Sequence, residues 1–69
     1  MRRYEVYRGQ EHHASVCVHE DGRKTWKYRS AWQDFYVKEH QPDIERALDI
    51  WRNHEELTLS GFTIRRRPE

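Results

Sequence analysis

Apolar and polar residues alternate along the first third of the chain, which is the period of a half-buried β-strand. In the first segment Tyr4 and Val6 fall on one face. The opposite face carries Arg3, Glu5 and Tyr7. The alternation recurs twice more, so the pattern predicts strands over residues 2–8, 14–19 and 24–29, with a polar turn over residues 9–13.

A short polar loop joins the second and third of these strands, and its length decides which side chains share a face. A two-residue turn at Asp21-Gly22 would place Val16 and Trp26 on opposite faces. A three-residue loop over residues 20–22 would place them on one face and requires a left-handed Gly22. Exposing the two valines of this hairpin would cost about 1.5–3 kcal/mol each, so burial predicts the three-residue loop.

Residues 30–41 carry two conflicting patterns. Ser30 and Gln33 have the spacing of a helix-capping box, and the aromatic residues that follow have helical spacing. Phe35 and Val37 alternate instead as they would in a strand, within a segment rich in strand-forming residues. We expect a strand or extended segment here, with a helix as the alternative.

The stretch from Gln41 to Glu56 has the clearest helical pattern in the chain. Pro42 suits the first turn of a helix. The apolar residues recur at i, i+3, i+4 and i+7, which gives a single apolar stripe. The stripe consists of Ile44, Ala47, Leu48 and Trp51, and the opposite face consists of Glu45, Arg46, Asp49, Arg52 and Asn53.

The C-terminal segment changes phase partway along its length. Leu57 and Leu59 have one parity, whereas the apolar residues from Phe62 onward have the other. The change predicts a turn or bulge at Gly61, followed by a last strand over residues 62–66.

An amphipathic helix on one face of an antiparallel sheet is the economical way to bury both apolar surfaces. The fold expected is therefore α+β, with three to five strands, one helix and the order β-β-β-(β)-α-β. The chain has 69 residues and makes one small domain, residues 1–69. Its three Trp, four Tyr and two Phe argue against disorder, although only 35% of the residues are hydrophobic.

Charge is unevenly distributed around a net value of +1. Residues 1–33 hold seven Arg or Lys against four Asp or Glu, and residues 57–69 hold three against one. Residues 34–56 hold three basic residues against seven acidic ones. The predicted fold thus has a basic sheet and an acidic helix.

A basic sheet face can bind an anion, such as a nucleic-acid backbone or an acidic patch on another protein. The three-residue loop places one polar row outward: Ser15, Cys17, His19, Arg23, Thr25, Lys27 and Arg29. An outward Tyr7 could stack on a base or anchor an interface. The alternative is a merely solvated face. The candidate partner-binding residues are Tyr7, Arg23, Lys27, Arg29, Arg65, Arg66 and Arg67.

Catalytic and metal chemistry find little support in the residues. Five histidines and one cysteine lack the clustered spacing of a zinc site. Cys17 and His19 share a strand face but have no third orienting group, and the glycines form no phosphate loop. A small nuclease using His19, Arg23 and Lys27 is the catalytic alternative. We expect no enzyme, no metal and no cofactor.

The single cysteine excludes an intramolecular disulfide and suits a reducing compartment. The N-terminal residues contain no apolar run, so neither a signal peptide nor a membrane span is expected. The prediction is a cytoplasmic protein with no membrane partner.

The sequence "PDIERALDIW" followed by "GFTIRRRP" resembles the helix–strand end of very small phage-encoded inhibitors of host machinery. The T7-type inhibitor of bacterial RNA polymerase has a similar acidic helix, Gly-Phe strand and arginines, although here the three arginines are contiguous. Anti-CRISPR proteins form a neighbouring class of similar size and charge. The resemblance implies that residues 65–67 contact a larger host protein or nucleoprotein.

A second resemblance is to DNA-binding folds with a three-stranded sheet and one helix, such as integrase arm-binding domains. Those folds place the sheet in the major groove, which implies that Arg23, Lys27 and Arg29 face DNA. The twelve residues between the third strand and the helix depart from that pattern.

Two hypotheses follow for the function. The first is a non-catalytic inhibitor that docks on a larger host protein or nucleoprotein through the basic sheet face and the arginine-rich last strand. The alternative is a nucleic-acid-binding domain that uses the same sheet face. A homodimer is left open.

Overall fold

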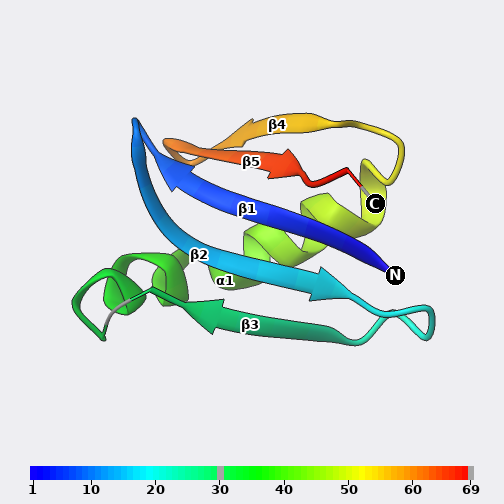
Figure 1. The fold of residues 1–69 in the computed structure, drawn as a ribbon, viewed down its shortest axis with the longest axis horizontal. Helices are drawn as coiled ribbons and strands as arrows, with labels where there is room; N and C mark the ends of the chain where they lie inside the picture. The colour runs from blue at the N-terminus through cyan, green and yellow to red at the C-terminus, as the bar shows by residue number, and fades with distance from the viewer. Residues whose placement is uncertain (30, 69) are drawn as a thin grey trace.

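The computed structural model describes residues 1–29 and 31–68, with the side chains of residues 31–34 excepted. Five strands and one helix make up the fold (Figure 1). They are β1 (Arg2–Arg8), β2 (Glu11–Val18), β3 (Lys24–Tyr28), α1 (Ala31–Ile50), β4 (Glu56–Leu59) and β5 (Phe62–Arg66).

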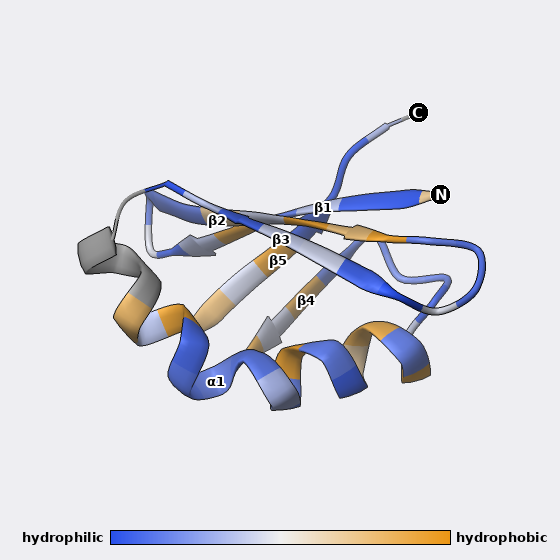
Figure 2. Cartoon of the chain, turned by 90° about the horizontal axis from the view of Figure 1, so that it is seen from below, coloured by the Kyte–Doolittle hydropathy of each residue, from blue (hydrophilic) through white to orange (hydrophobic). Residues whose placement is uncertain are grey.

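The five strands form one antiparallel sheet in the order β3-β2-β1-β5-β4. Helix α1 lies under one face of this sheet (Figure 2). The α+β prediction is therefore confirmed. The order differs in one respect, because the additional strand follows the helix as β4 and does not precede it.

The hairpin between β2 and β3 has the predicted three-residue loop. Val16 pairs with Trp26, and Ala14 pairs with Tyr28. The amide of residue 19 donates to the carbonyl of residue 23 at 2.8 Å, which closes the ladder above the loop. Gly22 has a φ of 89°, so the loop does use the left-handed residue that its length requires.

The core lies between α1 and the covered face of the sheet. Helix α1 contributes Val37, Ile44 and Leu48, which are fully buried. The strands contribute the alternate residues that their parity predicts, and these are Tyr4, Val6, Ala14, Val16, Val18, Phe62 and Ile64.

Polar contacts tie α1 to β3 at the edge of the sheet. Every second residue of β3 contacts every fourth residue of the helix. The rise of two strand residues is about 6.6 Å and that of four helical residues is about 6 Å, so the two spacings nearly match. The pairs are Lys24 Nζ with Asp49 Oδ1 at 3.0 Å, Trp26 Nε1 with Glu45 Oε2 at 3.1 Å, and Tyr28 Oη with Gln41 Oε1.

The prediction of an extended segment over residues 30–41 is wrong, since α1 begins at Ala31. Val37 is buried seven residues before Ile44, so it extends the helical stripe by two turns. Phe35, which suggested strand alternation, is 71% exposed. Pro42 therefore lies inside the helix and not in its first turn. The Ser30 capping box falls outside the described residues.

The end of the helix also differs from the prediction. Helix α1 stops at Ile50, and Trp51 beyond it is 48% exposed, so Trp51 does not belong to the apolar stripe. Glu45 and Asp49, expected on the solvent face, contact β3. Indole and ammonium donors on the edge strand give these two carboxylates partners that water would otherwise supply.

Strand β2 begins at Glu11, so the turn predicted over residues 9–13 is shorter than expected. The pairing of β1 with β2 shifts after Val6, which leaves His13 as the extra residue of a β-bulge. Because of the bulge, both His13 and Ala14 are buried. Sequence alternation alone cannot show such an insertion.

The phase change at Gly61 has a simple structural cause. Ser60 and Gly61 both have positive φ, 53° and 81°, and form a two-residue turn between β4 and β5. Leu59 pairs with Phe62 across this turn, so parity inverts while the apolar side chains stay on one face. The predicted last strand over residues 62–66 is confirmed as β5.

Replacement of Gly22 by Val should lower the free energy of unfolding by more than ~1 kcal/mol, because a β-branched residue is strained at a positive φ. A Cβ at this position meets no neighbouring atom, so the effect isolates the backbone conformation. Gly22→Asn is the control, since Asn tolerates this conformation. Urea denaturation of the three proteins provides the measurement, and equal stability of Gly22→Val and wild type would contradict the loop.

Replacement of His13 by Leu should raise the free energy of unfolding by about 1 kcal/mol, because an unpaired buried polar group is removed. Neither ring nitrogen of His13 has a hydrogen-bond partner among the described residues. The Glu11 carboxylate lies 3.8 Å away, too far for a hydrogen bond. His54→Leu, at an exposed position, should change stability by less than ~0.5 kcal/mol. A destabilised His13→Leu variant in thermal unfolding would refute this interpretation.

Candidate functional site

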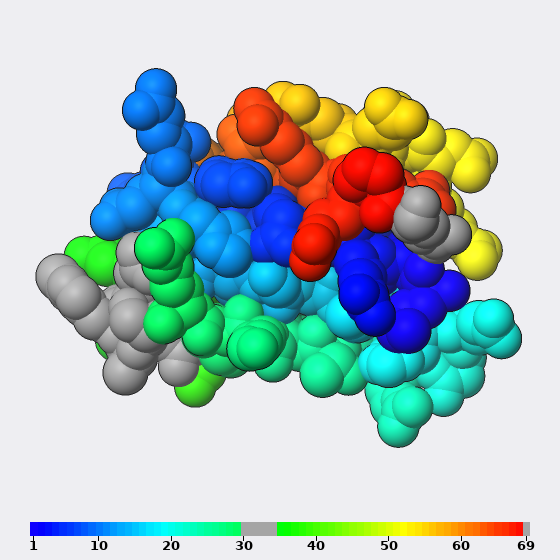
Figure 3. Space-filling model, in the orientation of Figure 1, coloured from blue at the N-terminus to red at the C-terminus, as the bar shows by residue number. Residues whose placement is uncertain are grey.

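The face of the sheet that α1 does not cover is called the outer face below. Figure 3 views the molecule from this side and shows side chains of β1, β2, β3 and β5 next to one another. Strand parity and register place thirteen polar or aromatic side chains here: Arg3, Glu5, Tyr7, His12, Ser15, Cys17, Thr25, Lys27, Glu56, Thr58, Thr63, Arg65 and Arg67.

One row of directly paired residues crosses the whole sheet on the outer face. Register places them in the order Lys27, Ser15, Glu5, Arg65 and Glu56, one from each strand. Cations and acids alternate along the row, and a hydroxyl lies between Lys27 and Glu5. Opposite charges on neighbouring strands stabilise a sheet, so the row supports the fold while its ends remain open to solvent.

Glu5 is the centre of the polar network on the outer face. Its side chain is only 16% exposed. The Oε2 atom accepts a hydrogen bond from Ser15 Oγ at 2.7 Å and lies 2.5 Å from His12 Nε2. Oε1 lies 3.4 Å from an amino group of Arg67. One carboxylate therefore holds side chains from β2 and from the segment after β5.

Tyr7 is the aromatic residue of the outer face. Its ring centroid lies 5.2 Å from that of His12, with the planes tilted by 50°. The Arg65 guanidinium lies over the ring, 5.6 Å from the centroid. The Nε atom of Arg65 is 3.4 Å from Glu56 Oε2. These contacts group two rings and a guanidinium into one cluster on the outer face, near the C-terminal end of the middle strand β1.

The candidate residues chosen from the sequence divide into three groups. The first group lies on the outer face and consists of Tyr7, Lys27, Arg65 and Arg67. The second group is exposed and flanks the two ends of β3, with Arg23 before the strand and Arg29 after it.

Arg66 forms the third group, because it has the parity of the covered face. Its backbone amide donates to the backbone carbonyl of Glu55 at 2.7 Å. Its guanidinium lies 3.5 Å from the backbone carbonyl of Arg52. The three contiguous arginines therefore do not act as one cluster. Strand alternation separates Arg66 from its two neighbours.

Sequence reasoning did not select Arg3, Glu5, His12 and Ser15 as site residues. Parity in β1 was sufficient to place Arg3 and Glu5 outward. His12 and Ser15 reach Glu5 through the register between β1 and β2 and its bulge, which strand alternation in the sequence does not report.

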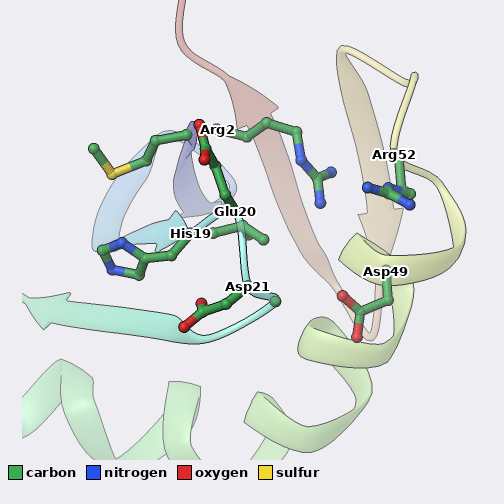
Figure 4. Close-up of a pocket in the computed structure, with 9 residues that line it drawn as sticks. Arg2, His19, Glu20, Asp21, Asp49 and Arg52 are labelled. Atoms are coloured by element: carbon green, nitrogen blue, oxygen red, sulfur yellow. The ribbon is translucent and has the colours of Figure 1, made fainter.

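An open hollow of about 550 Å³ lies between the hairpin tip, the start of β1 and the end of α1 (Figure 4). Its lining mixes Arg2 and Arg52 with Glu20, Asp21 and Asp49. Arg2 already donates to Tyr4 Oη at 2.7 Å and to a helix carbonyl at 3.2 Å. Mixed charge and occupied donors define no class of ligand, so the hollow does not compete with the outer face as a candidate site.

The remaining chemistry is limited. His19 contacts Thr25 Oγ1 at 2.8 Å, so its ring is engaged by a hydroxyl. No group of three or more potential metal ligands forms within residues 1–29 and 31–68. No helix in that part of the chain has both the length and the apolar character needed to cross a bilayer.

Comparison with known proteins gives no match to a family model, a curated protein or a solved structure.

Replacement of Glu5 by Leu should lower the free energy of unfolding by about 1–3 kcal/mol, because His12, Ser15 and Arg67 lose their shared acceptor. Glu56→Leu, at an exposed partner of Arg65, should cost less than about 1 kcal/mol. Chemical denaturation of both variants tests the difference. Equal losses would contradict a central role for Glu5.

Proposed function

We propose that this protein binds nucleic acid, without catalysis, through its outer face. The observation that carries the proposal is the density of cations on the uncovered face of the sheet. Four cations from four chain segments share this face, and two more flank it at the ends of β3. They are Arg3, Lys27, Arg65 and Arg67, flanked by Arg23 and Arg29. Phosphate contacts of this kind provide most of the affinity for nucleic acid.

The two acids of the outer face weaken this cationic character only in part. Glu5 is engaged by His12, Ser15 and Arg67, and Glu56 by Arg65. The hydroxyl groups of Thr58 and Thr63 share this face and can donate to phosphate oxygens as well. The acidic helix lies on the opposite face, away from a polyanion (Figure 2).

The composition of the outer face favours nucleic acid over a protein partner. The cores of protein interfaces are apolar and depleted of charged residues. Strand register places no aliphatic side chain on the outer face among the described residues. Cys17 is a free cysteine, which suits a reducing environment, and we propose a cytoplasmic location.

A second function, inhibition by docking on a larger host protein or nucleoprotein, is favoured by a different observation. Ile50 and Trp51 are adjacent at the end of α1 and are 60% and 48% exposed. Large exposed apolar side chains are typical anchors of protein interfaces. The phage-inhibitor resemblance supports this function, and in that case a partner with an acidic surface would occupy the outer face.

The charge reversal Arg65→Glu with Arg67→Glu should weaken nucleic-acid binding at least tenfold and lower the salt slope by about 0.7–0.9 per lost contact. Fluorescence anisotropy with a labelled 20-mer, titrated between 50 and 200 mM salt, provides the measurement. Arg46→Glu with Arg52→Glu, on α1 and just beyond it, makes the same change in net charge away from the outer face and serves as the control.

Absence of binding at low salt would refute the nucleic-acid function and leave protein docking as the favoured one. Equal weakening by the two pairs of charge reversals would also contradict it, because net charge and not the outer face would then determine binding.

A further inference from the structure

The width of the outer face restricts the form of nucleic acid that it can bind. Neighbouring strands lie about 4.8 Å apart, so β3 and β4, at the two edges, are about 19 Å apart. The major groove of B-form DNA is roughly 12 Å wide and admits a helix or a two-stranded ribbon. Strand β1 is the middle strand and cannot reach base edges inside a groove. The five-stranded sheet therefore departs from the three-stranded DNA-binding folds.

The helix offers no alternative reading element for duplex DNA. Its sheet-facing side is committed to the core and to β3. Its exposed side carries Glu39 and Asp43, which would repel phosphates. Duplex contacts would then be confined to backbone phosphates on the outer face.

The chemistry at the centre of the outer face favours contact with a nucleic-acid base over contact with a phosphate group. Glu5 places a carboxylate there, which repels a phosphate group. Beside it lie the Tyr7 ring and the Arg65 guanidinium, 5.6 Å from the ring centroid. Aromatic rings and arginine planes are the surfaces on which unpaired bases stack. Lys27 lies toward one edge of this centre, and Arg3 and Arg67 lie beside Glu5.

We propose that the ligand is a single-stranded nucleic acid that lies across the outer face, with one base stacked on the Tyr7–Arg65 pair. Its phosphates contact Arg3, Lys27 and Arg67. This inference rests on the proposed function and adds the form of the ligand. The recognised chemistry is an exposed base on a flexible polyanion, which single-stranded DNA and RNA share.

The test compares 12-nucleotide oligo(dT), oligo(rU) and a 12-base-pair DNA duplex at one low salt concentration, by fluorescence anisotropy. We expect at least tenfold tighter binding of one or both single strands than of the duplex. Tighter binding of the RNA or of the DNA strand supports the inference equally and identifies the source.

Tyr7→Leu should weaken single-strand binding about 5- to 150-fold, which corresponds to one lost stacking contact of about 1–3 kcal/mol. Duplex binding should stay unchanged. Tyr7→Phe keeps the ring and should retain affinity. Phe35→Leu, at a 71% exposed aromatic residue on α1, controls for loss of any surface ring. Circular dichroism on each variant confirms that the fold persists.

The outcomes separate the two proposals. The single-strand inference is overturned, and the nucleic-acid function stands, if the duplex binds as tightly as the single strands. The same conclusion follows if Tyr7→Leu binds single strands as tightly as wild type while Arg65→Glu with Arg67→Glu binds them more weakly. If none of the three ligands binds, both proposals fail together.

Discussion

The contact between α1 and β3 determines which face of the sheet is covered and which face stays open in this small domain. Two residues of strand and four residues of helix advance by nearly the same length, so Lys24, Trp26 and Tyr28 each find a polar partner on successive turns of the helix. The helix is thereby held along one edge of the sheet while its apolar stripe fills the core. One helix can cover only one face, so the other is left to solvent or to a ligand.

This arrangement also separates charge. Two helical acids have donors from β3, and Glu39 and Asp43 are exposed. The outer face keeps its cations because most of them have no acidic residue opposite on the next strand. Arg65 is the exception, because Glu5 and Glu56 lie opposite it on the two neighbouring strands. A polyanion therefore meets attraction on one side of the molecule and repulsion on the other.

Much of the fold follows from the sequence, and the failures have physical causes. Burial of Val16 was enough to predict the hairpin register, and the parity inversion at Gly61 was enough to predict a turn. The start of α1 was missed because the strand propensity of "DFYVK" competed with helical spacing. Val37 belongs to the helical stripe, but it lies seven residues before Ile44 and also alternates with Phe35 as in a strand. The Glu5 network was missed because it depends on register between β1, β2 and the C-terminal segment, which no local pattern encodes.

The bulge at His13 determines which side chains at the start of β2 reach the outer face. One extra residue inverts the direction of every side chain upstream of it in β2. His12 and His13 are chemically identical neighbours, yet the bulge sends His13 into the core and brings His12 to Glu5 and Tyr7. Without the bulge, regular alternation from Ala14 would turn His13 outward and His12 inward. The face of the sheet on which a side chain lies is thus set by its position relative to the bulge as much as by its chemistry.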